Sequence, residues 1–549
     1  MKTKSQKLYY IAYLAVFFAL LNACKTGPGS KNETKQYYVM EEVEEAADME
    51  YEKAARPVMM VDDEVEINVD ADVQPVDYNT EEYDRIYENP FKDAKQNPLS
   101  TFSIDVDNAS YSNVRRYLTG NQLPPPDAVR IEEMVNYFTY DYPDPKGEHP
   151  FSIITEVSES PWNPENKLVH IGIQGKKLNY DDLKPCNLVF LVDASGSMED
   201  ENKLPLLKKG LKMLIENLSS KDRIAIVAYA GAAGLVLPST EATEEKKIVK
   251  ALESLEAGGS TAGGEGIELA YKVAKENLIE NGNNRVILCT DGDFNVGISS
   301  TGDLVRTIEE KRKDGIYLTI CGFGMGNYKD NRMEQISNAG NGNYFYIDNI
   351  KEAQKVFVKE MRANLFTIAK DVKIQIEFNP AVVKAYRLIG YENRVMANED
   401  FEDDTKDAGE LGAGHTVTVL YEIIPVGSSQ KVPTTGDLKY QDTNLNENAS
   451  SSGEMMTVKF RYKPIKSDES ILIEQPIKDE SEKLASSSDN FRFSAAVAGF
   501  GMLLRGSEFK GDATYDMVLN LAEGAKGTDE EGYKAELVNL IEIASLLAK

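Results

Sequence analysis

Between residues 187 and 369, short runs of valine, isoleucine and leucine alternate with longer amphipathic stretches. Short continuous apolar runs are typical of strands buried on both faces, and apolar positions spaced three and four apart indicate helices. The expected strands are 188–192, 223–229, 235–238, 286–290, 317–322 and 344–347. Helices are expected in the gaps between them, for instance at 203–218, 244–255, 265–278 and 353–366. This alternation predicts an α/β domain with a parallel sheet flanked by helices.

The segments on either side of this domain follow a different pattern. Apolar and polar residues alternate over 102–106, 151–157, 168–174, 372–378, 416–423 and 456–462, as in half-buried strands. Helices are expected at 108–118 and 128–138, and a helical C-terminal region at 491–504, 515–523 and 533–547. Because the chain enters the α/β domain from strands and leaves it into strands, we expect 151–175 and 371–464 to pair. The α/β domain would then be inserted in, or flanked by, a β-rich, sandwich-like body.

The N-terminus resembles a bacterial lipoprotein signal. Lys2, Lys4 and Lys7 precede a short apolar stretch, which ends in Leu21-Asn-Ala-Cys24, a sequence similar to a lipobox. We therefore expect cleavage before Cys24, acylation of its thiol and anchoring to a membrane. The alternative is an ordinary secretory signal with a chance cysteine.

The expected organisation has six parts. Residues 1–23 form the signal peptide, 24–96 an acidic flexible tether, 97–180 an N-terminal α+β module, 187–369 the α/β domain, 370–480 a β-rich domain and 487–549 the helical region. A tether of about 70 residues has a root-mean-square reach of roughly 45 to 50 Å. Asp105 and Asp107 follow the first strand of the module, and we interpret Asp107 as a helix cap rather than a ligand.

Charge narrows the range of partners. The formal net charge is -29, and removal of the first 23 residues takes away three lysines and no acid. A chain this acidic repels nucleic acid and anionic headgroups, so no nucleic-acid partner is expected.

Oxygen-bearing side chains stand directly after two of the expected strands of the α/β domain and in one of its loops. Asp193-Ala-Ser195-Gly-Ser197 comes directly after strand 188–192, Thr261 lies in Gly-Gly-Ser-Thr, and Asp291 lies in Thr-Asp-Gly-Asp. Ligands of parallel sheets lie at the carboxyl ends of strands. Carboxylate and hydroxyl oxygens suit a hard cation such as Mg²⁺. If most direct ligands are neutral hydroxyls, the cation keeps an open position that attracts a partner's carboxylate.

These residues resemble the metal-ion-dependent adhesion site (MIDAS) of von Willebrand factor type A domains, whose pattern is Asp-x-Ser-x-Ser, then Thr, then Asp. The resemblance implies a Rossmann-like fold, hydroxyl ligands from Ser195, Ser197 and Thr261, and Asp193 and Asp291 acting directly or through water on Mg²⁺ or Mn²⁺. Asp293 and Asn295 are possible specificity residues beside the cation. Cys289 and Cys321 would lie on neighbouring strands of this fold, where we expect buried free thiols rather than a disulfide.

Several alternatives compete with an adhesion site. An isolated Asp-x-Ser-x-Ser is often only a helix cap or turn. A calcium loop starting at Asp291 is rejected, because Val296 replaces the required glycine and Gly302 the required glutamate. The three histidines lie outside the α/β domain, so no catalytic triad is predicted at Ser195 and we do not expect an enzyme. A metal-dependent hydrolase, or an envelope scaffold that uses the cation only for stability, stays open.

The order of lipobox, acidic linker, module, type A domain and the segment Tyr386-Arg-Leu-Ile-Gly-Tyr-Glu-Asn393 resembles bacterial von Willebrand factor type A lipoproteins. That resemblance implies a lipid-anchored protein of the bacterial cell envelope, which we place on the outer membrane facing the periplasm. The expected function is binding of a protein partner that presents an acidic side chain to the MIDAS cation.

Overall fold

The computed structural model describes residues 81–104, 107–178, 184–259, 263–292, 301–325, 329–360, 366–406, 408–434, 436, 445, 447–481 and 483–549. The predictions made for Cys24, Asp105, Thr261, Asp293 and Asn295 lie outside these residues. Among the described helices, none combines the length and apolar character that crossing a membrane requires.

The α/β domain is built on a six-stranded sheet in the order β10-β9-β8-β5-β6-β7. Its strands are β5 (Cys186–Asp193), β6 (Arg223–Tyr229), β7 (Ala233–Glu241), β8 (Asn283–Thr290), β9 (Ile316–Phe323) and β10 (Tyr344–Ile347). Neighbouring strands run parallel except β7, which pairs antiparallel with β6 at the edge. The prediction of a parallel sheet is therefore right for five strands and wrong for β7, because the short link after Tyr229 permits only a hairpin.

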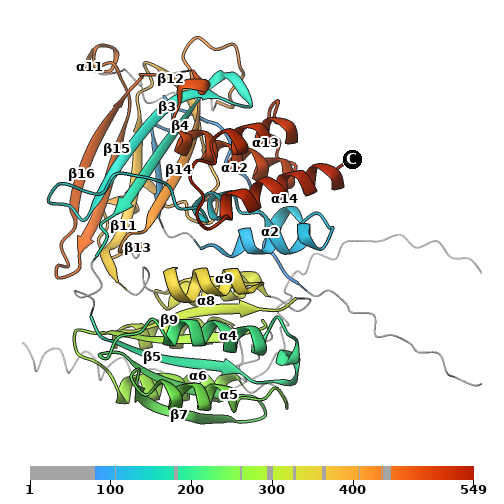
Figure 1. Ribbon diagram of the computed structural model, residues 1–549. Helices are drawn as coiled ribbons and strands as arrows, with labels where there is room; N and C mark the ends of the chain where they lie inside the picture. Colours follow the sequence, from blue (N-terminus) through green and yellow to red (C-terminus); the bar gives the residue numbers. More distant parts are fainter. Residues whose placement is uncertain are drawn as a thin grey trace, which may run out of the picture. The chain divides into compact units, whose positions relative to one another are not determined.

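Helices cover both faces of this sheet, as the apolar runs require. Alternate residues of β5 enter opposite cores: Leu188 and Phe190 pack on one side, Val189 and Leu191 on the other. The first core is completed by α4 (Leu204–Ile215), α5 (Glu245–Glu253) and the π-helical turn Lys355–Glu360 that follows α9 (Ile350–Gln354). The second is completed by α6 (Gly263–Glu276), α7 (Thr301–Arg312) and α8 (Asp330–Ala339). In Figure 1, α4 and α6 lie near β5.

The body contains two antiparallel sheets packed through a shared apolar core. One has the order β1-β12-β14-β4-β3, from β1 (Lys92–Asp93), β12 (Val383–Ile389), β14 (Thr416–Pro425), β4 (Asn163–Gly175) and β3 (Phe151–Ser160). The other has the order β13-β11-β15-β16, from β13 (Gly409–Gly412), β11 (Thr367–Phe378), β15 (Glu454–Pro464) and β16 (Ile471–Lys478). β2 (Leu99–Ser103) also pairs with β11.

The predicted insertion is confirmed by strand pairing across the α/β domain. β4, which precedes that domain, pairs along its length with β14, which follows it, with Thr418 opposite Gly172. β2 and β11 form a second such pair. The segments 97–180 and 370–480 therefore fold as one body around the inserted domain.

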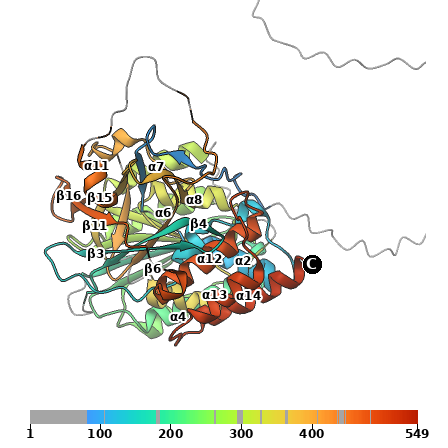
Figure 2. The same ribbon diagram turned by 90° about the horizontal axis from the view of Figure 1, so that it is seen from above.

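A helical layer covers the outer face of the first sheet. It contains α2 (Ala109–Thr119), α3 (Ile131–Asn136), α12 (Asp489–Arg505), α13 (Tyr515–Gly524) and α14 (Tyr533–Leu547). Figures 1 and 2 show α12, α13 and α14 beside α2, and the contacts between α14 and α2 agree. The expected C-terminal helical region is thus part of the core of the body.

Several boundaries differ from the sequence prediction. Residues 81–96 were assigned to the tether, yet β1 pairs with β12, and the Glu81 carboxylate accepts hydrogen bonds from Arg116 (2.9 Å) and from the Tyr117 hydroxyl (2.6 Å). These contacts are made by side chains and one very short strand, so the segment has no periodicity to detect. The expected helix 128–138 is shorter, because Pro126–Ala128 forms a separate 3₁₀ turn before α3.

The interpretation of Asp107 as a helix cap is wrong. The residue before α2 is Asn108, which makes no side-chain cap. Asp107 instead accepts hydrogen bonds from the Tyr344 backbone N–H (2.9 Å) and from Arg394 (3.1 Å). It joins the module to β10 of the inserted domain, a contact between distant residues that local sequence does not contain.

Buried ion pairs form a seam between the inserted domain and the body. Arg130, which precedes α3, pairs with Asp330 and Glu334 of α8. Arg115 of α2 pairs with Asp348 and with Glu352 of α9. Removing one partner of such a pair strongly destabilises the fold, because the other charge is left buried without a partner.

Cys289 and Cys321 are free thiols, as predicted. Cys289 and Cys321 are register partners on β8 and β9, and both are buried free thiols, as is Cys186. Burial raises the pKa of the Cys289 thiol, so this side chain is an unreactive part of the core.

Candidate metal centre

The candidate metal centre lies at the carboxyl edge of the α/β sheet. β5 and β8 are parallel neighbours, with Val192 opposite Cys289, so the chain leaves both strands at the same edge. Asp193 ends β5 and Asp291 follows β8. The structure thus brings together the two carboxylates that the sequence placed on separate strands.

Asp193 has both carboxylate oxygens engaged by the chain. Oδ1 accepts the Ser195 backbone N–H (2.9 Å), whereas Oδ2 accepts the hydroxyls of Tyr229 (3.0 Å) and Thr290 (3.2 Å). Burial raises the pKa of Asp193; hydrogen bonds from Ser195 lower it, and the nearby Asp291 carboxylate raises it. Asp193 therefore holds the turn that carries the two serines, and a cation would contact it most simply through water.

The two serine hydroxyls lie next to each other. Ser195 Oγ and Ser197 Oγ are 3.0 Å apart, with Ser195 buried and Ser197 exposed. Two backbone hydrogen bonds to another segment hold the turn that carries these serines. The Ala194 carbonyl accepts the Gly258 N–H (2.8 Å), and the Gly196 N–H donates to the Gly259 carbonyl (3.2 Å). This contact also places the start of the loop that carries Thr261 beside the serines.

Asp291 has one oxygen paired and one oxygen unpaired. Its side chain is buried, and Oδ1 has no hydrogen-bond partner among the described residues. Oδ2 lies 3.2 Å from Nζ of Lys203. A buried carboxylate oxygen without a partner is costly unless a cation or water satisfies it.

Lys203 was not predicted as part of this site. It immediately precedes α4, is 8% exposed, and donates from Nζ to the Ser197 carbonyl (2.8 Å). A polar residue at the start of a helix is common, so the position of Lys203 six residues after Ser197 did not indicate that it belongs to the site.

The donor set fits a hard divalent cation. Among the described residues, no cluster of three or more His, Cys, Asp or Glu side chains is arranged to hold a metal. The candidate centre instead combines two hydroxyls with the unpaired Oδ1 of Asp291, which is the oxygen-only chemistry that Mg²⁺ accepts. Thr261, Asp293 and Asn295 belong to loops outside the described residues.

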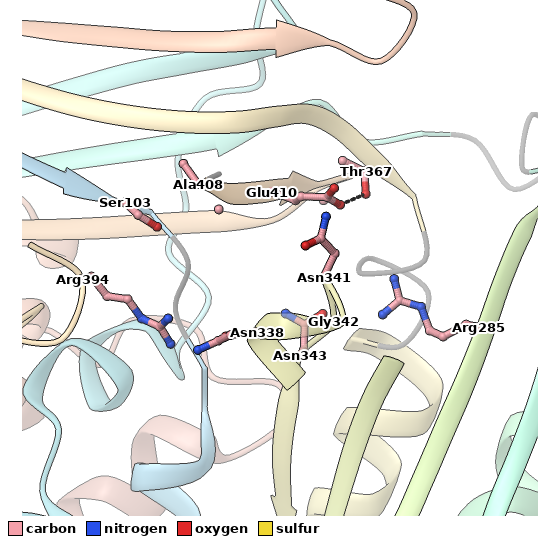
Figure 3. A pocket seen from close by; sticks show the side chains of 12 residues that line it. Ser103, Arg285, Asn338, Asn341, Gly342, Asn343, Thr367, Arg394, Ala408 and Glu410 are labelled. Carbon is pink, nitrogen blue, oxygen red and sulfur yellow. Dashed lines mark hydrogen bonds between the residues drawn. The ribbon is translucent and has the colours of Figure 1, made fainter. Parts of the chain in front are cut away.

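A separate polar cavity of about 200 Å³ lies in the seam (Figure 3). Arg285, near the opposite end of β8 from Asp291, and Asn341 line it from the inserted domain, and Thr367 and Glu410 line it from the body. Thr367 Oγ1 donates to Glu410 (2.7 Å), and burial lowers the pKa of the Arg285 guanidinium. This cavity belongs to the junction with the body and is distinct from the candidate metal centre.

Comparison with known proteins supports the architecture. Three family profiles match: "von Willebrand factor" over residues 77–170, "von Willebrand factor type A domain" over 187–359 and "Uncharacterized protein YfbK, C-terminal" over 363–547. Their order follows the module, the inserted domain and the region after it.

Individual proteins are also similar to this chain. The chain is 43% identical over 473 residues to "Uncharacterized protein YfbK" of Escherichia coli, covering 85% of this chain and 81% of that protein. It is 30% identical over 190 residues to "Uncharacterized protein sll0103" of Synechocystis sp., covering 34% of this chain and 44% of the relative. Among solved structures, "von Willebrand factor type A from Catenulispora acidiphila" is 16% identical with a TM-score of 0.38, covering 70% of this chain and 89% of that one.

Identity over most of both chains, together with the three matching profiles, settles the family. The inserted α/β domain is a von Willebrand factor type A domain, a kind of domain associated with protein–protein interaction and adhesion. The chain belongs to the family of bacterial von Willebrand factor type A domain proteins that includes YfbK of E. coli.

Proposed function

We propose that this protein binds a protein partner through a divalent cation, Mg²⁺ or Mn²⁺, at the carboxyl edge of its type A domain. Ser195, Ser197 and Asp291 would hold the cation, with Thr261 as a further ligand and Asp193 positioning the serine turn. The observation that carries the proposal is the buried Oδ1 of Asp291, which has no hydrogen-bond partner in the described chain and lies at the edge that presents both serine hydroxyls.

The partner is a protein that presents an acidic side chain. Two neutral hydroxyls and one carboxylate neutralise a divalent cation only in part, so a carboxylate is the ligand that an open position favours. The residues after Ser197 are Met198, which is buried, and the exposed acids Glu199, Asp200 and Glu201. Because these acids repel a uniformly negative surface, we expect the partner's carboxylate to be flanked by neutral or basic residues.

We further propose a lipid anchor at Cys24, with the protein in the bacterial cell envelope, on the outer membrane facing the periplasm. The lipobox-like sequence before Cys24 supports the anchor, and the acidic sequence between Cys24 and the folded part supports its role as a tether.

No catalytic function is proposed: His170 is buried in the body, bonded to Tyr142 (2.6 Å) and Ser494 (3.0 Å), and His149 bonds Tyr462 (3.0 Å).

The proposal is tested with Ser197→Ala. The exposed hydroxyl is lost without opening a cavity, so the free energy of unfolding should change by less than about 0.5 kcal/mol. Affinity for Mn²⁺, measured by isothermal titration calorimetry, should fall at least about tenfold. Capture of partners from a detergent extract of envelope proteins should require Mg²⁺, be prevented by EDTA and be lost in the variant.

Ser254→Ala is the matched control, because Ser254 is an exposed serine of the same domain that bonds only a local carbonyl, that of Ala251 (2.7 Å). It should behave as the wild type in all three measurements. A variant of Ser197 that melts far lower in Mg²⁺ but captures the same proteins would instead favour the envelope-scaffold alternative, in which the cation only stabilises the fold.

A further inference from the structure

Lys203 places a positive charge inside the candidate metal centre. Its Nζ lies 2.8 Å from the Ser197 carbonyl oxygen and 3.2 Å from Oδ2 of Asp291. It is also 3.5 Å from Asp200, but that carboxylate is 72% exposed and so contributes little. The ammonium thus binds two of the groups that frame the serine turn.

The fold provides a dedicated path for this side chain. Lys203 is buried, and its stem runs against Gly324, where an added Cβ would lie 2.3 Å from Cε and 3.0 Å from Cδ. Gly324 has φ +79°, and its carbonyl accepts the Tyr346 hydroxyl (2.5 Å), which fixes the backbone at this point. A larger residue at 324 would close the path, so the position of the ammonium is built into the structure.

The charges around the site determine what Lys203 does there. Among the described residues of this site, Asp193 and Asp291 are the buried carboxylates, and Lys203 is a buried ammonium in contact with Asp291. Without a divalent cation, Lys203 stabilises the negative charge of Asp291. With a divalent cation bound, the cation and the Lys203 ammonium together carry more positive charge than the Asp193 and Asp291 carboxylates neutralise. One further negative charge would balance these described groups.

We propose that Lys203 is the internal counter-ion of this site: it weakens divalent-cation binding on its own and reserves one negative charge for the partner's carboxylate. The inference rests on the proposed function. It makes cation binding and carboxylate binding mutually reinforcing, because each supplies the charge that the other lacks. The ligand is therefore a monoanionic carboxylate, of the kind that a single Asp or Glu side chain supplies.

The test compares Lys203→Met with the wild type, using Mn²⁺ as the metal probe and acetate as the carboxylate probe. Methionine keeps an unbranched stem beside Gly324 and removes the charge. Removing a positive charge that lies beside the cation removes a Coulomb repulsion, so we expect Mn²⁺ to bind at least about tenfold tighter in Lys203→Met. Acetate should strengthen Mn²⁺ binding in the wild type and do so much less in the variant.

Lys209→Met is the matched control, since it removes the same charge six residues further along, within α4, at a side chain that is 59% exposed. It should change Mn²⁺ affinity by no more than about twofold, because surface charges are screened. Lys203→Gln is the second variant and should repeat the gain in affinity if Lys203→Met does not fold.

Two failures are distinguishable. If Asp291→Asn abolishes Mn²⁺ binding while Lys203→Met and Lys203→Gln bind it no tighter than the wild type, the counter-ion role is overturned and the metal site stands. If wild-type protein binds no Mn²⁺ and Asp291→Asn changes nothing, the proposed function itself fails, and the inference fails with it.

Discussion

Asp193 and Asp291 have the same chemistry but different surroundings. The Asp193 carboxylate accepts hydrogen bonds from Ser195, Tyr229 and Thr290, and these bonds hold the serine turn in place. Asp291 faces one ammonium and keeps one oxygen unpaired among the described residues. The distinction decides which carboxylate is available to a cation, and it follows from the residues of neighbouring strands rather than from the motif.

A residue-scale prediction concerns His170 in the body. Burial lowers its pKa from the ordinary value of 6.5 to about 3, so the folded protein keeps it neutral. In the unfolded chain the same side chain binds a proton below pH 6.5. The contribution of neutral His170 to the free energy of unfolding is therefore present above pH 6.5 and is lost as the pH falls towards 3. The loss amounts to about 2 kcal/mol between pH 7 and pH 5.

His170→Gln removes this contribution while leaving His149, His415 and every carboxylate unchanged. Urea unfolding of both proteins at pH 7 and pH 5 should show that the free-energy advantage of the wild type shrinks by that amount at the lower pH. An advantage of equal size at both pH values would contradict the assignment of a neutral, buried His170.

The elements of the chain show how backbone contacts limit substitution. The turn between α8 and β10 runs so close to β9 that a Cβ on Gly342 would lie 1.5 Å from the Leu318 carbonyl oxygen. The neighbouring N–H of Leu318 donates to Gly340 (3.0 Å), so this backbone cannot move without losing strand hydrogen bonds. The parallel pairing of β9 and β10 thus depends on glycine at this point.

We predict that Gly342→Ala lowers the free energy of unfolding by about 2 to 3 kcal/mol, the upper part of the usual range of about 1 to 3 kcal/mol for forced overpacking. Gly234→Ala is the control, because a Cβ there meets nothing within 4 Å, and it should change stability little. Urea denaturation measures both. Equal midpoints for the two variants would show that the α8–β10 turn tolerates a side chain.

Elements with strong periodicity were predicted well, and those without it were missed. β6, β10 and α14 begin and end where the apolar pattern placed them. α7 and α8, which carry mostly polar residues, were expected only as helices in the gaps between strands, without bounds. β13 is four residues long with two glycines, and β16 is largely exposed. Their conformations depend on neighbours far along the chain, which local pattern cannot supply.

The same limit applies to the candidate site. The motif gave Asp193, Ser195, Ser197 and Asp291, because strand ends of a parallel sheet share an edge. It did not give Lys203, whose contacts require the path beside Gly324. Gly324 directly follows β9 and lies more than a hundred residues further along the chain, so no spacing rule near Lys203 reveals this contact.

At the scale of the molecule, the type A domain leaves and rejoins the body at neighbouring points. An added Cβ on Gly175, at the end of β4, would lie 3.0 Å from the Ile368 side chain at the start of β11. Arg115 and Arg130 of the helical layer then pair with acids of the inserted domain. Two covalent connections and buried ion pairs hold the domain to the body, which suits a protein that presents one binding edge.

We propose above that the carboxyl edge of the inserted sheet binds a divalent cation. The most direct measurement is anomalous diffraction from crystals of the protein soaked in Mn²⁺. We expect a peak in direct contact with Ser195 Oγ, Ser197 Oγ and the Asp291 carboxylate, with Asp193 outside direct contact. A peak only at the exposed acids Glu199, Asp200 and Glu201, or none at this edge, would contradict it.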